Sequence, residues 1–451
     1  MKGEIRMSTL KPKNWVFLIP EDATATSILY APLHKIAVRV SSQARDLLVP
    51  ILDGGQEDVT DSPQKDELLG FLASNKLLEL PKEWVPEQSN TGKGKAKITM
   101  SLTNKCNLRC IYCYAKTGMD YTTMTLEVAK DAIDSVIREA VQNGEKKFGI
   151  TFHGGGEATV ELKFLRKCVA YIQEQARVYD LKPSLGMVTN ATLITKPIAV
   201  WMGKHFSNVT VSFDGLEEVQ DYQRPDSRGK GTFVRVIRGI QNLMEVGIKP
   251  SIRATVTDFG VNRMTDFVEY LAKEVFPKGG SIHFEPMSLC GRAADNELTT
   301  NPQAYMENYL KAKEVGKKVG MEVTCSFDTF GHEKKQFCGA NRSTMFCVSP
   351  HGLVSACSRV TKPTDDGADL FFYAKHNGQS GGFDVDPDAV SKIVAHGNLP
   401  KNPCVSCFAR WNCQGHCPIA RYAYHEHHEQ SCIIIQELLK SAIIAKLDKN
   451  L

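Results

Sequence analysis

The sequence predicts an α/β fold built on a parallel sheet, with a small α/β unit before it and a cysteine-rich region after it. Strand-like and helix-like segments alternate from residue 98 to residue 284, which is the pattern of βαβ crossovers. Three cysteines follow the first of these strands, and eight of the chain's 14 cysteines lie between Cys338 and Cys432. We divide the chain into an N-terminal unit (1–80), a linker (81–97), a sheet region (98–310) and a C-terminal region (311–451).

The amino-acid composition argues against several classes of protein. The 451 residues are 42% hydrophobic and 24% charged, as in an ordinary globular protein of two or three domains. A net charge of +4 argues against a dedicated nucleic-acid binder. No apolar run is long enough to span a bilayer, and the first residues lack the apolar stretch of a signal peptide. We therefore expect a cytoplasmic protein without a nucleic-acid or membrane partner, whose clustered cysteines bind metal rather than form disulfides.

The N-terminal unit reads as strands followed by short helices. We expect a strand at 15–19, a hairpin of strands 27–33 and 36–40 across His34 and Lys35, and helices at 44–52 and 66–73. Ser41 or Ser42 is placed to cap the first helix. Residues 81–97 are rich in proline, glycine and polar residues, which is typical of a linker.

The sheet region alternates regularly. Strands are expected at 98–103, 148–152, 185–188, 209–213, 251–256 and 281–284. Helices are expected between them, at 125–144, 164–177, 197–204, 233–246 and 264–275, with Thr125 as the cap of the first. A closing amphipathic helix is expected at 433–447.

Cys106, Cys110 and Cys113 form a C-x3-C-x2-C motif, with Tyr112 before the third cysteine. This spacing places three thiolates on one short loop and leaves a fourth position open, which suits an iron–sulfur cluster that binds something besides protein. A zinc site is the alternative, although zinc would recruit a fourth protein ligand within this stretch.

The motif resembles the signature of the radical S-adenosylmethionine (radical SAM) enzymes. The resemblance implies a partial (β/α)6 barrel and a [4Fe–4S] cluster held by these three cysteines. In that family the open iron is chelated by S-adenosylmethionine, which is cleaved to a 5′-deoxyadenosyl radical.

The carboxyl ends of the strands are expected to build the site. Motifs at these ends resemble the family's cofactor loops, and the contacts that the resemblance implies are Tyr112, Gly155, Gly156, Glu157, Thr189, Asn190, Ser212, Asp214 and Arg224. Asp214 as a turn former, and Asp221 with Arg224 as a local ion pair, remain alternatives. Arg253 and Glu285 are expected at the same end of the barrel, where the carboxyl ends of the strands lie, but they have no assigned role. No catalytic residue is identified.

The C-terminal cysteines resemble the SPASM extension of radical SAM proteins, which implies two further [4Fe–4S] clusters and three in all. An inner set would be Cys338, Cys347, Cys357 and Cys417, and an outer set would be Cys404, Cys407, Cys413 and Cys432. A zinc ribbon would use only four of these eight thiolates. Cys168, Cys290 and Cys325 are expected to be buried apolar residues, and the histidines of residues 425–428 to lie in a solvated connection, with a second metal site as the alternative.

Two branches of the SPASM group are candidates for the function of this chain. Sulfatase maturases place an aspartate directly after the cysteine equivalent to Cys357, where it acts as a base, whereas this chain has Ser358. The N-terminal unit resembles the element with which peptide maturases add a leader peptide as an extra strand. We therefore predict a maturase that cross-links a ribosomal precursor peptide through a thioether or carbon–carbon bond, with a flavodoxin or ferredoxin as electron donor. A formylglycine-generating dehydrogenase and a non-catalytic electron carrier are the alternatives.

Overall fold

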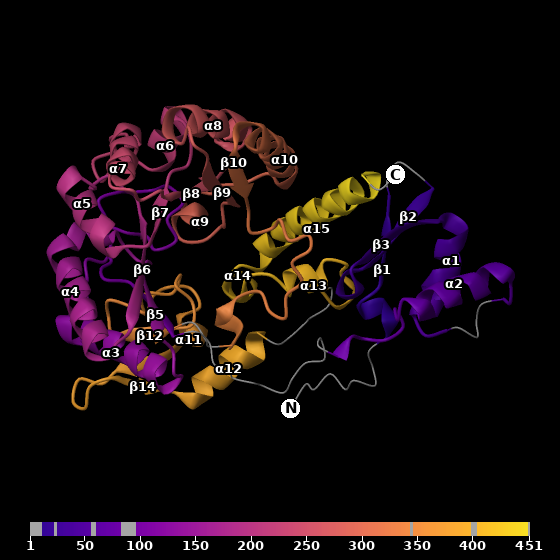
Figure 1. Cartoon of the computed structure of the whole chain (residues 1–451), viewed down its shortest axis with the longest axis horizontal. Coiled ribbons are helices and arrows are strands. Elements are labelled where there is room, and N and C mark those ends of the chain that lie inside the picture. Colours follow the sequence, from indigo (N-terminus) through magenta and orange to yellow (C-terminus); the bar gives the residue numbers. More distant parts are fainter. Residues whose placement is uncertain are drawn as a thin grey trace.

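The computed structural model describes residues 11–21, 25–55, 60–82, 96–342, 346–397 and 404–449. Its strands form two sheets, an antiparallel one of order β1-β2-β3 and a large one of order β10-β9-β8-β7-β6-β5-β4-β11-β12-β13-β14. The small sheet lies at one end of the molecule and an arc of helices at the other, with the long helix α15 between them (Figure 1). Residues 83–95 of the predicted linker lie outside the described residues.

The N-terminal unit follows the predicted order of elements. Its strands are β1 (Phe17–Pro20), β2 (Thr26–Ala31) and β3 (Ile36–Ser41), followed by α1 (Ser42–Leu52) and α2 (Pro63–Ser74). The Ser41 side chain accepts a hydrogen bond from the Ala44 backbone at 3.2 Å, so the predicted cap of α1 is confirmed. Strands β1 and β3 each pair with β2 alone and are the two edges of this sheet.

Seven parallel strands form the core of the large sheet, and the predicted fold class is confirmed. The strands are β4 (Lys97–Met100), β5 (Lys147–Phe152), β6 (Lys182–Thr189), β7 (Asn208–Ser212), β8 (Ser251–Val256), β9 (Gly280–Pro286) and β10 (Met321–Thr324). The first six correspond to the six predicted strands. Strand β10 was not predicted, because four residues are too short to show an alternation pattern.

Helices cover the outer face of these strands (Figure 1). They are α3 (Leu126–Gln142), α4 (Leu162–Val178), α5 (Lys196–His205), α6 (Glu217–Gln223), α7 (Phe233–Glu245), α8 (Met264–Tyr270) and α10 (Pro302–Val319), whereas the short α9 (Arg292–Asp295) lies inside the arc, next to the cysteine loop. Thr125 caps α3 through the Val128 backbone at 3.3 Å, and the predicted apolar face of α3 is buried. Helix α10 crosses residue 310, where the domain boundary was predicted.

The C-terminal region extends the same sheet. Strand β11 (Phe346–Val348) pairs in parallel with β4, and β12 (Leu353–Ser355), β13 (Phe372–His376) and β14 (Phe383–Val385) continue as an antiparallel meander. The helices of this region are α11 (Ala368–Phe371), α12 (Pro387–Gly397), α13 (Arg410–Cys413), α14 (Pro418–Ala423) and α15 (His425–Asp448). Helix α15 begins eight residues before the predicted start, so residues 425–428 are helical rather than a connection; their side chains lie outside the described part.

The N-terminal unit is joined to the C-terminal region by polar contacts. The Tyr30 hydroxyl donates to Asn412 at 3.2 Å, and the Trp411 indole donates to the Asn14 carbonyl at 2.9 Å. At the far end of α15, Asp448 pairs with Arg39 of β3 at 2.6 Å. Across the described ranges, no helix combines the length and the apolar character that crossing a membrane would need.

Candidate functional site

The loop that carries Cys106, Cys110 and Cys113 follows β4. Its turn is closed by a hydrogen bond from the Cys113 backbone to the Cys110 carbonyl at 3.2 Å, and the Leu108 amide lies 3.4 Å from the Cys106 sulfur. Burial raises the pKa of Cys106 to about 11 and that of Cys110 to about 12. These thiols stay neutral unless a bound cation stabilises the thiolates, so the donors and their environment fit a metal cluster.

The chain after α6 fixes the backbone of this cysteine loop. Backbone N–H groups of Arg109 and Ile111 donate to the carbonyls of Pro225 (2.8 Å) and Gln223 (3.0 Å). The Ser227 amide donates to the Asn107 carbonyl at 3.0 Å. The cysteine loop is thereby paired, residue by residue, with a segment more than 100 positions away.

The glycine loop after β5 packs against the cysteine loop from another side. The Gly156 amide donates to the Thr103 carbonyl and the Glu157 amide to the Lys105 carbonyl, both at 2.8 Å. A Cβ atom on Gly156 would lie 2.0 Å from the Lys105 carbonyl oxygen, and one on Gly155 would lie 2.4 Å from Asn104 Oδ1. Glycine is needed here because two backbones meet. Contact of Gly155 and Gly156 with a cofactor stays a prediction.

The Glu157 carboxylate joins two strand ends. Its Oε1 accepts hydrogen bonds from the hydroxyls of Thr159 (2.7 Å) and Thr189 (2.9 Å), and its Oε2 accepts from the Asn190 backbone at 2.7 Å. The side chain is buried. The structure thus brings together the predicted residues Glu157, Thr189 and Asn190, while the predicted contact of Glu157 with a ligand amine stays a prediction.

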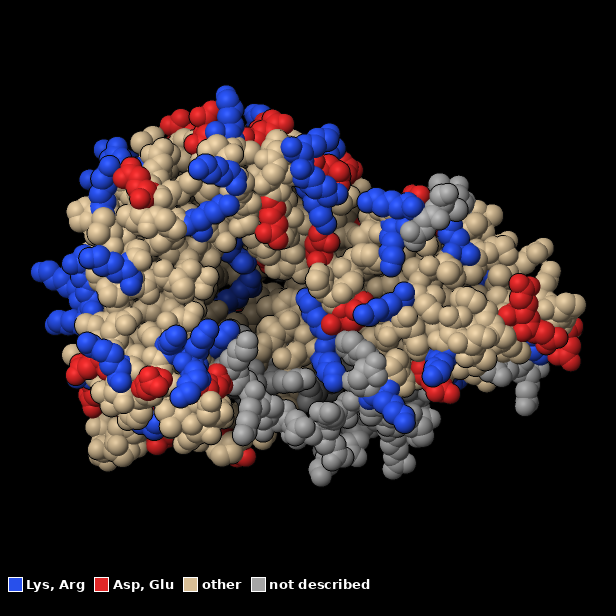
Figure 2. Space-filling model, viewed as in Figure 1, with Lys and Arg blue, Asp and Glu red and all other residues tan. Residues whose placement is uncertain are grey.

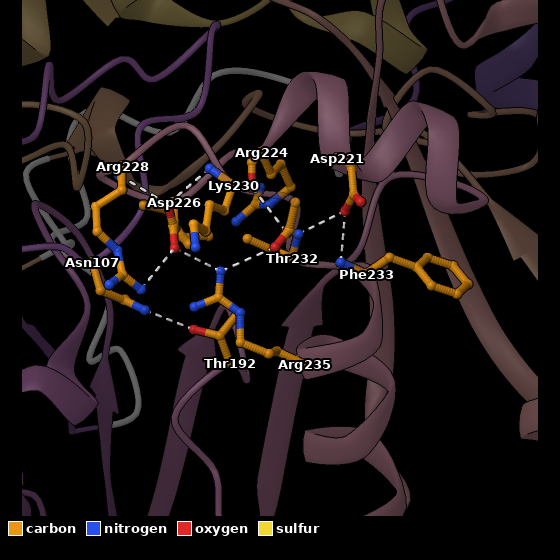
Figure 3. A network of polar contacts seen from close by, with 12 residues as sticks. Asn107, Thr192, Asp221, Arg224, Asp226, Arg228, Lys230, Thr232, Phe233 and Arg235 are labelled. Carbon is orange, nitrogen blue, oxygen red and sulfur yellow. Dashed lines mark hydrogen bonds and ion pairs between the residues drawn. The ribbon is translucent and has the colours of Figure 1, made fainter.

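Asn190 continues the connection to the cysteine loop. Its side chain donates to Asn107 Oδ1 at 3.0 Å, and Asn107 donates to the Thr192 hydroxyl at 2.8 Å (Figure 3). The end of β6 is therefore tied to the residue that follows Cys106.

Tyr112, Asp214 and Arg224 form a second, largely buried group, and their predicted contact with the cofactor stays a prediction. The Tyr112 hydroxyl donates to Asp214 Oδ2 at 2.5 Å and accepts from Arg224 at 2.6 Å, and burial raises the pKa of Tyr112. Arg224 and Asp214 form an ion pair at 3.9 Å. Among the described residues the buried Arg224 Nε has no partner, which leaves a donor for an acceptor on a bound ligand. Ser212 lies two residues before this group, at the end of β7.

Asp221 does not pair with Arg224. Its carboxylate accepts hydrogen bonds from the backbones of Thr232 (2.6 Å) and Phe233 (2.7 Å), at the start of α7 (Figure 3). It therefore acts as a helix cap, and the predicted alternative of a local Asp221–Arg224 ion pair is wrong.

Sequence reasoning missed Asp226, which orders the segment paired with the cysteine loop, and Arg292, which contacts the cysteine loop itself. Asp226 accepts hydrogen bonds from the backbones of Arg228 (2.8 Å) and Lys230 (2.9 Å) and pairs with Arg235 at 3.0 Å (Figure 3). The hydrogen bond from the Lys230 backbone is the main cause that lowers the pKa of Asp226 to about 2. On the other side, Arg292 donates to the Cys110 carbonyl at 2.9 Å. Only the position of Arg292, just after the predicted last strand, could have signalled its role.

The inner C-terminal cysteines come from four separate segments. Cys347 lies on β11, Cys357 follows β12, Cys417 precedes α14, and Cys338 precedes β11. Burial raises the pKa of Cys357 to about 12, and the neighbouring thiols of Cys417 and Cys347 add to this rise. Cys338 acts in the same way on Cys347. The predicted set is therefore mutually close, and its ligand role stays a prediction.

The outer cysteines line a single small cavity of about 20 Å³. Its walls include all four members of the predicted set, Cys404, Cys407, Cys413 and Cys432. Within the described residues, no three His, Cys, Asp or Glu side chains converge as the ligands of one metal ion would. A cubic cluster binds its thiolates at four different irons, and a cavity lined by four cysteines fits such a group. Cys168, Cys290 and Cys325 are buried, as predicted.

Comparison with known sequences finds the family that the cysteine motif resembles. A family model described as "Radical SAM superfamily" matches residues 100–271. A GTP 3′,8-cyclase of Petrotoga mobilis is 30% identical over 280 residues, which cover 61% of this chain and 80% of that protein. An uncharacterized protein of Methanocaldococcus jannaschii is 32% identical over 178 residues, 40% of this chain and 59% of its own length. The chain thus spans only part of some of its relatives.

Solved structures show the same fold at low sequence identity. The sulfatase maturase anSMEcpe, solved with AdoMet and the Kp18Cys peptide, superposes with a TM-score of 0.63 at 20% identity, over 78% of this chain and 99% of that one. SuiB of Streptococcus suis, solved with S-adenosylmethionine, gives a TM-score of 0.52 at 14% identity, over 90% and 95%. SuiB has also been solved with the precursor peptide SuiA.

Proposed function

This chain belongs to the radical SAM superfamily and is a radical SAM enzyme, and we propose that it is a maturase that cross-links a ribosomally made precursor peptide. The bond formed would be a thioether or a carbon–carbon bond, with net loss of hydrogen from the peptide. The cysteines Cys106, Cys110 and Cys113 would hold the [4Fe–4S] cluster that binds S-adenosylmethionine. When bound, this pair supplies a 5′-deoxyadenosyl radical, which abstracts hydrogen from unactivated carbon.

The chain's own residues position the reaction. Glu157 and Asn190 fix the strand ends next to the cysteine loop, and Tyr112, Asp214 and Arg224 close the site on the side of β7. The side chains of Glu157, Asn190, Asp214 and Arg224 are buried, which limits the access of water to this part of the site. We propose that the cofactor lies between these two groups of side chains, with Ser212 as a further contact.

The observation that carries the proposal is Ser358. A dehydrogenase that oxidises a Cys or Ser side chain needs a base to remove the thiol or hydroxyl proton. The residue after Cys357 is Ser358, which lines a small cavity together with His153 and Thr361. A serine hydroxyl is not a base at neutral pH, whereas forming a cross-link from a carbon radical does not require one at this position.

A peptide substrate is supported by two further points. Both structural neighbours have been solved with peptides, and the chain's own small sheet has edge strands, β1 and β3, to which an extended leader peptide could pair. We propose that the eight C-terminal cysteines hold two more [4Fe–4S] clusters, whose chemistry is electron transfer. A cytoplasmic flavodoxin or ferredoxin would be the electron donor.

Two measurements test this function. The anaerobically purified enzyme should release 5′-deoxyadenosine with dithionite, and Cys106→Ala should abolish this release. Co-expression with a small peptide encoded by a neighbouring gene should yield a peptide that has lost hydrogen mass and carries a new cross-link in fragmentation spectra. An unmodified peptide beside an enzyme that actively cleaves the cofactor would contradict the maturase assignment.

A formylglycine-generating dehydrogenase is the second candidate, because the superposition on anSMEcpe has the higher TM-score of the two neighbours. It predicts conversion of a single Cys or Ser in a short peptide to an aldehyde, which hydrazide labelling would detect. The cross-linking maturase predicts no aldehyde.

A further inference from the structure

A row of polar side chains crosses the last four parallel strands. Ser212, Arg253, His283 and Thr324 are register partners on β7, β8, β9 and β10. Register partners in a parallel sheet project from the same face. The residues before them on these strands, Val211, Ile252, Ile282 and Val323, are buried toward the helices. The polar row therefore faces the inside of the sheet's curve, on the side away from the helices.

A fixed carboxylate stands beside this row. Glu285 Oε2 accepts hydrogen bonds from Ser326 at 2.6 Å and from His283 at 2.9 Å, and the other His283 nitrogen lies 3.0 Å from the Thr324 hydroxyl. Burial alone would raise the pKa of Glu285, but the hydrogen bonds from His283 and Ser326 and the charge of Arg253 lower it to about 2. Glu285 is ionised at neutral pH and locked in place.

In contrast to the Glu285 carboxylate, the Arg253 guanidinium is not fully engaged by its neighbours. Its side chain is 45% exposed, and its ion pair with Glu285 spans 3.7 Å, which is too long for a hydrogen bond. Among the described residues, the Arg253 side chain makes one polar contact, which is this ion pair with Glu285. The five donors of an arginine fork would therefore be open to an acceptor that enters the curve of the sheet.

A second cationic side chain, that of Arg359 in the C-terminal region, lies near Glu285. Arg359 donates to the Ser288 hydroxyl at 3.3 Å and lies within electrostatic range of Glu285. Burial, with the charges of Arg253 and Arg359, lowers the pKa of His153 to about 4, so this nearby histidine is neutral at pH 7. Arg253 and Arg359 thus both lie within electrostatic range of the Glu285 carboxylate. Figure 2 shows a hollow between the arc of helices and the C-terminal region, with lysine or arginine atoms on its wall.

We propose that Arg253, with Glu285 and Arg359 around it, binds a carboxylate that the substrate peptide presents as an Asp or Glu side chain. The inference rests on the proposed function, since it takes a peptide as the substrate. A planar carboxylate matches the fork of one arginine. The site would select acidic peptides and hold them next to Ser212, on the cofactor side of the row.

The test is peptide selection by the anaerobic holoenzyme with S-adenosylmethionine present. End-blocked peptide libraries with one fixed position, which is Asp, Glu, Asn or Gln, are equilibrated with the enzyme and quantified by mass spectrometry. The acidic libraries should be retained roughly tenfold or more over their amides, which is the scale of one charge-assisted hydrogen bond. Arg253→Gln should lose this preference, and Arg253→Lys should keep part of it. The matched control Arg263→Gln, at an exposed arginine paired with Asp266 on the outer helix layer, should keep it fully.

The possible outcomes distinguish a failure of the proposed carboxylate site from a failure of the proposed maturase function. Equal retention of acidic and amide libraries by the unmodified enzyme would overturn the carboxylate site and leave the maturase function standing. Retention of no peptide would overturn both. Calorimetric titration with S-adenosylmethionine distinguishes the source of the carboxylate: Arg253→Gln should bind the cofactor as the unmodified enzyme does. A cofactor affinity that falls tenfold or more, with peptide preference unchanged, would assign Arg253 to the methionyl carboxylate and overturn the proposal.

Discussion

Substituting Gly156 with alanine tests how the cysteine loop is held. The added methyl carbon would lie 2.0 Å from the Lys105 carbonyl oxygen and 2.6 Å from its carbon, whereas ordinary contacts begin at 3.4 Å. Both neighbours are backbone atoms, so no side-chain rotation relieves the clash. Gly156 does not have a positive φ, so the clash, and not backbone strain, is the effect that the substitution isolates.

The cost follows from the contacts that must separate. Overpacking a tight contact costs about 1–3 kcal/mol. The movement would also strain the hydrogen bonds from Gly156 to Thr103 and from Glu157 to Lys105, each worth about 1 kcal/mol. We expect Gly156→Ala to lose about 3 kcal/mol of unfolding free energy. The matched control is Gly70→Ala in α2, where nothing lies within 4 Å and where alanine should gain about 0.5–1 kcal/mol.

The assay combines three readouts on anaerobically reconstituted protein: thermal unfolding, iron bound per chain, and release of 5′-deoxyadenosine. Gly156→Ala should unfold several degrees lower and release the product at least tenfold more slowly, because residues 103–105 lead directly into Cys106. Gly70→Ala should match the unmodified enzyme in iron and product. If Gly156→Ala retained normal stability, iron and product release, the glycine loop would not position the cysteines and the reasoning would be refuted.

Three further predictions follow from the same contacts. Glu157→Gln, which turns an acceptor of four hydrogen bonds partly into a donor, should slow 5′-deoxyadenosine release at least tenfold, whereas normal release would show that the Asn190 contact is dispensable. Because His153 has a folded pKa of about 4, below its ordinary 6.5, stability should be full above pH 6.5 and fall toward pH 4, by about 1 kcal/mol between pH 7 and pH 5.5. His153→Phe should flatten this part of the melting-temperature profile, and an unchanged slope would assign it to other groups. Cys404→Ala should remove about four of about twelve irons without affecting cofactor cleavage by dithionite, and an unchanged iron count would leave the outer cavity without a cluster.

Periodicity was enough to predict most of the fold. The apolar face of α3 and its cap Thr125 were predicted because 17 helical residues give several repeats of the pattern. Helix α6, with seven residues, and strand β10, with four, were missed because neither is long enough to repeat a period. The pairing of β11 with β4 joins residues about 250 positions apart, and no local pattern encodes that contact.

The candidate site divides in a similar way. Residues that belong to short motifs, such as Cys106 and Glu157, were singled out because those motifs resemble the family's signatures and the residues of each motif lie close to one another in the sequence. Arg292 was missed because its contact with the backbone of the cysteine loop depends on how the chain returns in space, and Asp226 was missed because it binds the segment of residues 228–235. The alternative that paired Asp221 with Arg224 was wrong because the Asp221 carboxylate caps α7.

The docking of the N-terminal unit has a practical consequence. Tyr30 bonds to Asn412 and Asn14 bonds to Trp411, the two residues just before Cys413, and Arg39 pairs with the end of the helix that carries Cys432. Truncating the chain before residue 90 would remove these contacts next to the cysteines of the outer cavity. A truncated enzyme that fails could therefore have lost a redox centre rather than a leader-binding module, and grafting this unit onto another maturase would require transplanting its receiving surface as well.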